Sequence, residues 1–465
     1  MFIGREKQLK FLKDRYKKGK FEFIVIRGRR RIGKSTLIKE FCKDKQDVII
    51  YLSQQRNKAD SLLLFSNVVN QYLRREGIYQ DFESLFKVIF EESKKKRITL
   101  VIDEFPYLAN SDKSIMSILQ NLIDEYKNES KLYLIICGSS ISFMEDEVLA
   151  YKAPLYGRCT GQMKIEGLYY SDLKEYLKPY SDDEKITLYS IFGGIPAYLE
   201  TIDNKKTVKD NIIENLMEMN SFLYEETDTL LKEELREPSI YNSIIGAIAN
   251  GSSRLNEIST KIGLEKDKVA VYLQKLIYLQ IVKKENPITE RETSKKSIYS
   301  INDNFFKFWY RFIANNKVRI EFDDNKDGIY EDLILPYLND YIGHIFEDIC
   351  KDYILLHINS NKVPFAFNQI GRWWGTNNTT KVEEEIDLIA FSDDNKNAFF
   401  VECKWRNEKV TKNVLNDLIR KSELLPQFKN KFYGIFSKSG FTKEVQEFAG
   451  KNDNVYLYDL NDLFK

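Results

Sequence analysis

The sequence predicts a multidomain α/β protein. At 465 residues the chain is too long for one hydrophobic core, so we expect two to four domains. Residues 21–27, 98–102 and 132–137 are short runs rich in β-branched and aromatic residues, the pattern of buried strands. The run at 21–27 leads through a glycine-rich loop into a helical segment, which is the strand–loop–helix order of α/β domains.

Charge, cysteine content and hydrophobicity exclude several classes of protein. Lys and Arg number 71 against 70 Asp and Glu, so any basic surface for nucleic acid must be local. Two histidines and five widely spaced cysteines argue against a histidine metal site, a Ser-His-Asp triad and a disulfide framework. The N-terminus lacks the layout of a signal peptide, and no apolar run reaches the roughly 18 residues of a membrane helix. We therefore predict a cytoplasmic protein with no membrane partner.

A phosphate-binding loop follows the first predicted strand. The loop matches the pattern GxxxxGK[ST] and consists of Gly28, Arg29, Arg30, Arg31, Ile32, Gly33, Lys34, Ser35 and Thr36. Its glycines let backbone N–H groups close around phosphate oxygens, and the N-terminus of the following helix favours negative charge. We predict that Lys34 neutralises the β- and γ-phosphates of a nucleoside triphosphate and that Ser35 binds Mg²⁺.

Two carboxylates end the second predicted strand. Asp103 and Glu104 follow the apolar run at 98–102, an arrangement typical of the Walker B motif. Asp103 is expected to hold the water shell of Mg²⁺, and Glu104 to orient the attacking water, which favours hydrolysis over binding alone. Two acids after a strand are often only solvated, but the phosphate-binding loop upstream supports the catalytic interpretation.

Ser139 and Arg158 each have a functional and a structural interpretation. Ser139 follows the third predicted strand, which we place between the two Walker strands, so its side chain can sense the γ-phosphate; a serine there is equally suited to cap a helix. Arg158 follows a loop and can act as an arginine finger, in its own chain or in a neighbouring subunit of a homo-oligomer. A simple surface arginine explains Arg158 equally well.

Six motifs in order make residues 1–235 similar to a known family. FIGRE at 2–6, the GRRRIGKS loop, DEFPYL at 103–108, GSS at 138–140, PLYGR at 154–158 and GGIPAYL at 193–199 resemble the archaeal-type AAA+ ATPases, relatives of the STAND and origin-binding ATPases. The resemblance implies that residues 2–6, including Arg5, approach an adenine, which favours ATP. It also implies a helical lid in which Pro196 packs near the base. The lid arginine common in that family is not evident here.

Helical segments follow Pro238, and their spacing predicts a helix-turn-helix with its turn at 262–264, followed by a hairpin that suits a wing. Between Arg254 and Ser300 ten Lys and Arg stand against six Asp and Glu, which favours DNA phosphate contacts, although such modules also serve for packing. The candidate contacts are Lys266, Lys268, Lys275, Lys283, Lys284, Lys295 and Lys296. The aromatic segment 305–312 is interpreted as a face buried against a neighbouring domain.

The C-terminal part contains acids and a lysine in a pattern that suits Mg²⁺-dependent phosphodiester cleavage. Glu402 and Lys404 lie two apart on a predicted strand and share a face, and Asp387 on a paired strand can approach them. Glu347 is an acid on an otherwise apolar helix face. We expect Glu347, Asp387 and Glu402 to bind Mg²⁺, and Lys404 to orient water or offset developing charge. The alternative is a surface salt-bridge set.

The surroundings of these residues resemble a second known domain. NQIGRWWG at 368–375, EID at 385–387 and VECKW at 401–405 are similar to the restriction-endonuclease-like PD-(D/E)xK domain that is often fused to archaeal-type ATPases, over residues 340–440. All core positions of that site are intact. His344 is interpreted as a structural residue, Trp373 and Trp374 as packing residues, and Lys421 as a weak additional candidate.

The complete prediction has five segments: a P-loop AAA+ ATPase core at 1–168, a helical lid at 169–236, a winged helix-turn-helix with the aromatic helix at 237–313, a linker at 314–338, and a restriction-endonuclease-like α/β domain at 339–465. The expected function is an ATP-hydrolysing, DNA-acting enzyme in which the ATPase and winged helix control a Mg²⁺-dependent endonuclease. The alternative is a nucleotide-dependent switch or DNA-binding regulator whose C-terminal domain binds without cleaving.

Overall fold

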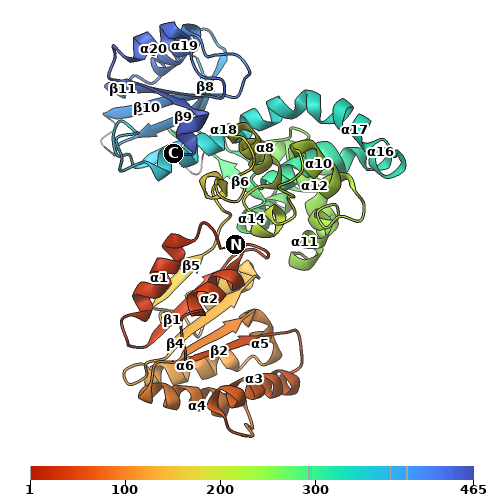
Figure 1. Cartoon of the computed structure of the whole chain (residues 1–465), viewed down its shortest axis with the longest axis vertical. Helices are drawn as coiled ribbons and strands as arrows, with labels where there is room; N and C mark the ends of the chain where they lie inside the picture. Colours follow the sequence, from red (N-terminus) through yellow and green to blue (C-terminus); the bar gives the residue numbers. More distant parts are fainter. Residues whose placement is uncertain (1, 292–293, 295, 378, 394–395) are drawn as a thin grey trace. The chain divides into compact units, whose positions relative to one another are not determined.

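The computed structural model describes residues 2–291, 294, 296–377, 379–393 and 396–465. The chain forms two compact units (Figure 1). The first unit comprises Met1–Gly167 and Ile195–Ala197, and the second Leu168–Gly194 and Tyr198–Lys465. Among the described residues, no helix combines the length and apolarity that crossing a bilayer requires.

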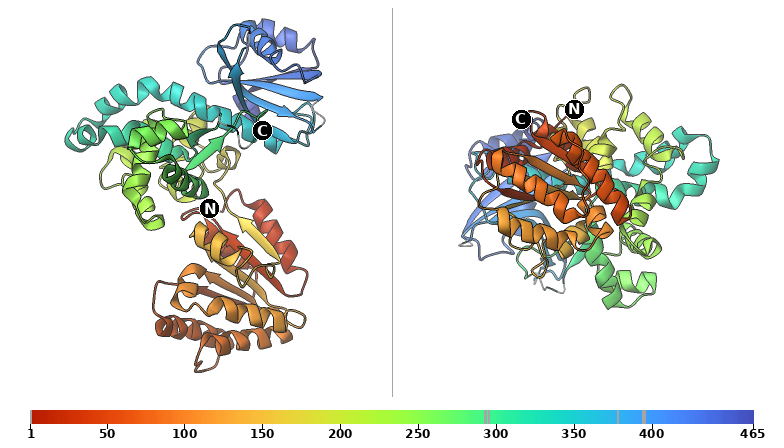
Figure 2. Two further views of the ribbon diagram at one scale, coloured as in Figure 1. Left: turned by 180° about the vertical axis from the view of Figure 1, so that it is seen from behind. Right: turned by 90° about the horizontal axis from the view of Figure 1, so that it is seen from below.

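The first unit is a five-stranded parallel sheet with helices on both faces (Figure 1; Figure 2). The strands lie in the order β2-β3-β4-β1-β5. In chain order the elements are α1 (Glu6–Tyr16), β1 (Glu22–Arg27), α2 (Lys34–Cys42), β2 (Val48–Leu52), α3 (Lys58–Leu73), α4 (Phe82–Lys95), β3 (Thr99–Asp103), α5 (Phe105–Ser111), α6 (Ile115–Tyr126), β4 (Tyr133–Gly138), α7 (Ile141–Phe143) and β5 (Gly161–Lys164).

The strands of this sheet are continuous apolar runs because both of its faces are covered. Leu134 of β4 belongs to the core that α3, α4 and α6 form with one face. Its neighbour Tyr133 points to the other face and packs against Tyr16 of α1 and Phe41 of α2. The predicted position of β4 between β1 and β3 is confirmed, so the ends of these three strands lie side by side at the carboxyl edge of the sheet.

The second unit combines a helical part with a five-stranded mixed sheet, in the order β12-β11-β10-β9-β8. Its elements are α8 (Asp182–Phe192), α9 (Pro196–Leu199, which begins in the first unit), α10 (Val208–Ile212), α11 (Glu226–Glu234), α12 (Pro238–Ala249), α13 (Leu255–Ile262), α14 (Lys266–Tyr278), β6 (Val282–Glu285), β7 (Ile298–Ile301), α15 (Asn304–Phe308), α16 (Lys317–Phe322), α17 (Lys326–Leu333), α18 (Leu335–Leu356), β8 (Gln369–Thr376), β9 (Glu383–Phe391), β10 (Asn397–Lys404), α19 (Lys412–Ser422), β11 (Asn430–Ser437), α20 (Lys443–Ala449), β12 (Val455–Asp459) and α21 (Leu460–Leu463).

The middle of the chain has the helices and hairpin that the sequence predicts. Helices α13 and α14 are separated by a turn at Gly263, whose φ of 70° favours glycine. Strands β6 and β7 then form an antiparallel hairpin. The aromatic segment begins with α15, where Phe305, Phe306 and Phe308 are fully buried. Helix α15 packs against α8, so the prediction of a buried aromatic face is confirmed.

The C-terminal sheet is parallel from β10 to β12 and antiparallel from β8 to β10. On one face, a core that includes Phe400 and Ile435 packs against α19 and α20. On the other face, Tyr353 of α18 contacts Phe436 of β11 edge-on. The predicted combination of a parallel N-terminal sheet and a C-terminal α/β domain is therefore confirmed. Helix α18 lies against the strands that carry the predicted nuclease residues.

Candidate active sites

The phosphate-binding loop has the backbone geometry that its glycines allow. It connects β1 to α2, and Gly33 at the N-cap of α2 has a φ of 89°. Arg31 also lies in the left-handed region, with a φ of 66°. A Cβ atom on Gly28 would lie 2.6 Å from the carbonyl oxygen of Ile165, so the loop passes too close to this backbone for any side chain at position 28.

The predicted ligands of one Mg²⁺ ion lie next to each other. The hydroxyl of Ser35, at the start of α2, donates a hydrogen bond of 2.6 Å to Oδ2 of Asp103, at the end of β3. The Lys34 ammonium donates to the carbonyl oxygens of Gly28 and Arg29, at 2.8 and 3.0 Å. Lys34 is 5% exposed, so its charge is held inside the curve of the loop. Thr36 is exposed.

The second Walker B acid is fixed by the neighbouring strand. Glu104 has a φ of 52°, and its backbone N–H donates to Oδ1 of Asp103 at 3.0 Å. Oε2 of Glu104 accepts two hydrogen bonds from Ser139, one from the hydroxyl at 2.8 Å and one from the backbone N–H at 3.2 Å. Ser140, and not Ser139, occupies the N-cap position of α7. The side chain of Ser139 therefore orients a carboxylate.

The residues implied by the resemblance to AAA+ ATPases surround the loop. Arg5 is 5% exposed and donates to the carbonyl oxygens of Glu166 at 2.6 Å and Ile32 at 3.2 Å, which joins residues 2–6 to the loop. A Cβ atom on Gly33 would lie 3.5 Å from Cγ of Pro196, so this proline packs against the loop. Arg29 is 1% exposed, and Nη2 of Arg30 donates to the hydroxyl of Tyr107 at 2.8 Å.

Arg158 lies near the amino ends of the strands, whereas the phosphate-binding loop lies at their carboxyl ends. Just after it, the backbone N–H of Thr160 donates to the carbonyl of Phe23, near the beginning of β1, whereas the loop follows the end of β1. Strands rise about 3.3 Å per residue, so the length of β1 separates Arg158 from the loop of its own chain by well over 10 Å. Its guanidinium binds Oδ2 of Asp124 at 2.5 and 3.1 Å. This geometry opposes a role in its own nucleotide site.

An irregularity in the C-terminal sheet positions Asp387. Between the pairs Gly371–Ile389 and Trp373–Ile386, one residue of β8, Arg372, faces two residues of β9. Those two residues are Asp387 and Leu388, so Asp387 lies in a β-bulge, a feature that redirects side chains near active sites. Strands β9 and β10 pair only as far as Leu388 with Val401. Beyond that pair, Oδ2 of Asp387 accepts a hydrogen bond of 2.7 Å from the backbone N–H of Cys403.

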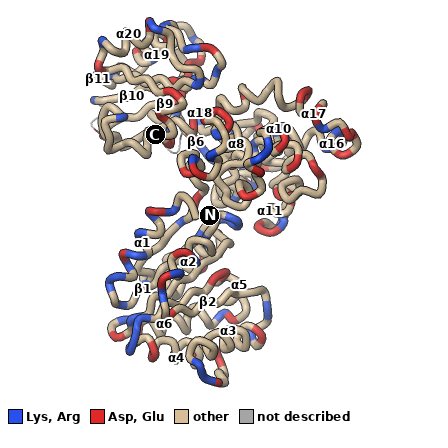
Figure 3. The backbone as a smooth tube through the Cα atoms, in the orientation of Figure 1, with Lys and Arg blue, Asp and Glu red and all other residues tan. Residues whose placement is uncertain are grey.

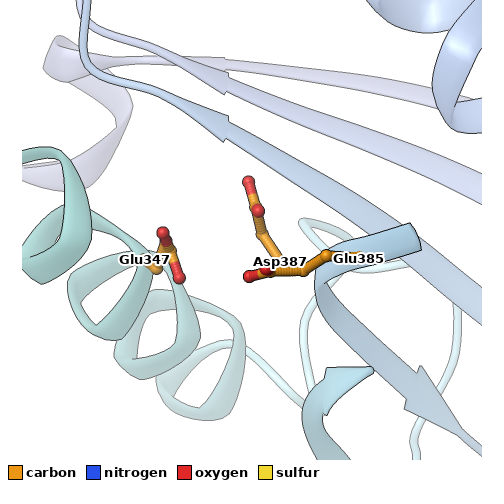
Figure 4. A group of neighbouring side chains, drawn as sticks. All are labelled: Glu347, Glu385 and Asp387. Atoms are coloured by element: carbon orange, nitrogen blue, oxygen red, sulfur yellow. The ribbon is translucent and has the colours of Figure 1, made fainter. Parts of the chain in front are cut away.

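Three carboxylates converge at this bulge. Glu347 of α18 faces Glu385 and Asp387 of β9 across a short gap (Figure 4). One oxygen of each lies within 4.8 Å of the others, a spacing that can hold a metal ion. Glu385 was not predicted as a ligand from the sequence, although it stands only two residues before Asp387. Predicted residues Glu347 and Asp387 are thus brought together, with an acid that was not predicted.

The acid and lysine of β10 form a close ion pair beside this cluster. The Lys404 ammonium donates to Oε1 of Glu402 at 2.5 Å, and Lys421 of α19 approaches Oε2 of Glu402 at 3.9 Å. Oε2 of Glu402 is buried and has no hydrogen-bond partner among the described residues. Burial lowers the pKa of Lys404, but the adjacent Glu402 carboxylate outweighs it and raises the pKa above its usual value. Lys404 is therefore a cation near neutral pH.

The site disfavours the charged form of the Asp387 carboxyl group. Burial raises its pKa to about 7, and the charges of Glu402 and Glu347 act in the same direction. The crowded negative charge is what a divalent cation would relieve. A cavity of about 350 Å³ opens onto Asp387, Glu347 and Lys404. His344 also lines it, and the Glu347 carboxylate raises the pKa of that histidine.

Basic residues of the middle segment differ in their availability to a ligand. Lys266, Lys268, Lys275 and Lys284 are exposed. Lys283 instead binds Asp348 of α18 at 2.7 Å and Glu285 at 3.4 Å, so it serves packing against the C-terminal domain. Lys296 pairs with Glu290, and Lys295 lies outside the described residues. Figure 3 shows basic and acidic residues interspersed along the described chain, so DNA contact requires a local group of lysines.

Three segments of the chain match known protein families. Residues 2–202 match an ATPase domain predominantly from Archaea. Residues 309–415 match a group of archaeal and bacterial proteins of unknown function. Residues 366–465 match a restriction endonuclease domain. The last match covers Asp387, Glu402 and Lys404.

Individual proteins are similar over most of the chain. The uncharacterized protein MJECL04 of Methanocaldococcus jannaschii is 37% identical over 468 residues, which cover 99% of this chain and 100% of the relative. Among solved structures, the Walker-type ATPase paby2304 of Pyrococcus abyssi has a TM-score of 0.52 and 16% identity, with 67% of this chain and 96% of that chain covered. The ORC2 protein of Aeropyrum pernix has a TM-score of 0.43 and 12% identity, with 71% and 96% covered. The likeness to the Pyrococcus protein shows the fold over the 67% of this chain that it covers.

Proposed function

Because this chain belongs to the family of ATPases found predominantly in Archaea, we propose that it hydrolyses ATP and cleaves DNA, and that the ATPase controls the cleavage. The single observation that carries the nuclease assignment is the convergence of Glu347, Asp387, Glu402 and Lys404 from a helix and two strands. Asp387, Glu402 and Lys404 lie within the segment that matches a restriction endonuclease domain, and Glu347 lies on the helix that precedes it.

In the ATPase site each proposed role rests on a contact. Ser35 and Asp103 are the Mg²⁺ ligands, since their oxygens lie 2.6 Å apart. Lys34 neutralises the β- and γ-phosphates. Glu104 orients the attacking water, and Ser139 fixes the Glu104 carboxylate through two hydrogen bonds. Pro196 lies against the loop, which supports its proposed place near the base.

The C-terminal donor set suits Mg²⁺, which prefers oxygen ligands. Glu347, Asp387 and Glu402 offer only carboxylate oxygens, and Oε2 of Glu402 is buried without a hydrogen-bond partner among the residues described. When bound there, Mg²⁺ would polarise the scissile phosphate and lower the pKa of an attacking water. Lys404, held by Glu402, is a cation that stabilises the charge developing on the phosphate and does not act as a base.

DNA contact is assigned to the middle of the chain. We infer that α12, α13, α14 and the β6–β7 hairpin form a winged helix. The exposed lysines Lys266 and Lys268 lie in the first turn of α14, the helix that would approach a DNA groove. Lys275 and Lys284 supply further phosphate contacts.

Control of cleavage has a physical basis within the second unit. The hairpin contacts the nuclease-like domain directly, because Lys283 of β6 binds Asp348 of α18. The backbone N–H of Ile288, in the hairpin connection, also donates to the carbonyl of Arg372 at 2.9 Å. Asp348 and Arg372 are immediate neighbours of the carboxylate cluster. A movement of the hairpin would therefore displace residues that lie beside the candidate nuclease site.

Arg158 is proposed to act in a neighbouring subunit. In its own chain the parallel sheet separates it from the phosphate-binding loop, so an arginine-finger role requires a second copy. The proposal therefore includes a homo-oligomer.

The test uses the full-length chain, linear, circular and branched DNA, and Mg²⁺ with or without ATP. The key variant is Asp387→Asn, which keeps the shape of the side chain and removes its charge. The matched control is Glu384→Gln on the same strand, since Glu384 pairs with Arg420 outside the cluster. Cleavage by wild type and control but not by Asp387→Asn supports the nuclease. Cleavage that survives Asp387→Asn refutes it, and ATP hydrolysis without any cleavage favours a DNA-binding regulator.

A further inference from the structure

A second cavity lies beside the candidate nuclease site, between the β6–β7 hairpin and α18. Its volume is about 260 Å³, and it is lined by the end of α12, both hairpin strands, α15 and α18. His344 and Glu347, one turn apart on α18, line both this cavity and the cavity that opens onto Asp387. The two cavities therefore share a wall, and an extended ligand that lies along α18 can reach both.

The acids of the second cavity are engaged by neighbouring cations. Asp348 pairs with the Lys283 ammonium at 2.7 Å, and Glu285 lies 3.4 Å from the same ammonium. Oε2 of Glu347 lies 3.5 Å from Nε of Arg372. Each of the three acids among the described lining residues thus has a cationic partner within 3.5 Å.

Lys307 of α15 is the lining cation for which no acid remains. Arg311, four residues later, pairs with Asp340 at 3.0 Å. The Lys307 ammonium instead makes no hydrogen bond or ion pair within the part of the chain that the structure describes, although the side chain is partly buried. Burial lowers the pKa of Lys307, and the carboxylates around it, Asp348 foremost, offset only part of that effect. An anion bound in the cavity would supply the missing partner.

The rest of the lining suits a phosphate group on a DNA strand. Ser253 and Tyr299 line the same cavity as Lys307, and lysine ammonium and hydroxyl groups are common protein contacts to DNA phosphates. The shared turn of α18 between His344 and Glu347 rises about 4.5 Å, whereas phosphates follow one another about every 3.4 Å along one strand of a duplex. A strand whose scissile phosphate lies in the first cavity therefore presents a neighbouring phosphate to the second.

We propose that this cavity binds a backbone phosphate of the DNA strand, next to the scissile phosphate, and that Lys307 is the cation that holds it. Ser253 and Tyr299 supply further donors. A strand held there contacts the hairpin and α18 together, so binding of the substrate fixes the hairpin against the nuclease-like domain. This inference rests on the proposed DNA cleavage, and it adds a substrate subsite with the residue that defines it.

Chemical labelling of lysine amines tests whether the cavity is occupied. The full-length wild-type chain is labelled in a chelator, which prevents metal-dependent cleavage, with duplex DNA, single-stranded DNA, inorganic phosphate or no addition. Mass spectrometry then gives the labelling of each lysine. We expect DNA, and not inorganic phosphate at an equal concentration of phosphate groups, to reduce labelling of Lys307. Lys429 is the matched control, because it is exposed and adjoins the beginning of β10, whereas Glu402 and Lys404 lie at the end of that strand.

The salt dependence of DNA binding tests whether the contact is a charge contact. Fluorescence anisotropy in the same chelator gives the slope of log K against log salt concentration. Lys307→Met should lower the magnitude of this slope by about 0.7–0.9, the contribution of one phosphate contact, and Lys307→Arg should restore it. Lys429→Met should leave the slope unchanged. Thermal unfolding shows which variants fold, and labelling of the wild-type chain decides the question if Lys307→Met does not.

Each result bears on the subsite separately from the nuclease. Lys307 that DNA leaves unprotected, or an unchanged slope in folded Lys307→Met, would overturn the inference, and DNA cleavage by the same wild-type chain would leave the nuclease proposal intact. Protection by inorganic phosphate but not by DNA would also overturn it, since the site would then take a free anion. Protection by DNA in a chain that never cuts DNA would support the phosphate contact and refute the nuclease.

Discussion

Replacement of Ser139 by alanine tests how the ATPase site fixes its water-orienting acid. The hydroxyl of Ser139 donates to Oε2 of Glu104 at 2.8 Å, and the backbone N–H of the same residue donates to the same oxygen at 3.2 Å. The substitution removes the shorter bond and keeps the longer one. Glu104 therefore stays near its position but is held by one donor.

The expected magnitude follows from the bond that is lost. A hydrogen bond to a charged group contributes about 1.5–3 kcal/mol. If about 1.5 kcal/mol of this acts in the transition state, kcat for ATP hydrolysis falls about tenfold. Binding of ATP should change little, because the described hydrogen bonds of the Ser139 hydroxyl and N–H go to Glu104, whereas those of Lys34 go to the loop carbonyls.

The assay is steady-state phosphate release, with nucleotide affinity measured separately by titration. Ser140→Ala is the matched control, since Ser140 makes no side-chain capping hydrogen bond. Glu104→Gln sets the lower limit of activity. An unchanged kcat in Ser139→Ala would refute the positioning role. A loss as deep as that of Glu104→Gln would show that the backbone N–H alone cannot hold the carboxylate.

Three further predictions concern other parts of the chain. Gly28→Ala should weaken nucleotide binding at least tenfold in a fluorescence titration, because its Cβ would lie 2.6 Å from a carbonyl oxygen; Gly246→Ala, with open space, should not. Arg158→Ala should lower ATP turnover per chain most at high protein concentration, and turnover independent of concentration would contradict a role in trans. With its pKa raised to about 7, Asp387 destabilises the metal-free fold increasingly as pH rises from about 4 to 7. Asp387→Asn should therefore stabilise the chain more at pH 8 than at pH 5 in urea unfolding, and an equal effect would exclude this charge penalty.

Functional residues are predicted most accurately from the sequence where the residues of a site are close together along the chain. The residues of the phosphate-binding loop are contiguous in sequence, and so are the two Walker B acids. In each case an apolar strand pattern and the residues directly after it are enough to predict the positions of Lys34, Ser35 and Asp103. The C-terminal residues Asp387 and Glu402 are far apart in sequence, but Asp387 directly precedes an apolar run and Glu402 directly follows one. Strand periodicity and the resemblance to nuclease domains together predict their convergence.

Other features depend on tertiary contacts that no local pattern contains. Lys283 counts toward the basic excess of the middle segment, but in the fold it pairs with Asp348 and is not available to DNA. The edge of the sheet at which Arg158 lies depends on how β5 pairs with β1. The position of Arg372 depends on a one-residue difference between two paired strands. These relations arise from register and packing, which single-residue properties do not determine.

Both candidate sites use a local break in regular backbone to aim an acid. Glu104 adopts a left-handed conformation directly after β3, and Asp387 lies in the bulge of β9. In a regular strand the alternation of side chains would point these acids to a fixed face, whereas the break turns them toward their partners. Such conformations cost free energy and persist only when the surroundings hold them. The hydrogen bonds from Ser139 to Glu104 and from Cys403 to Asp387 provide that support, so the residues that hold each acid are as much a part of the site as the acid itself.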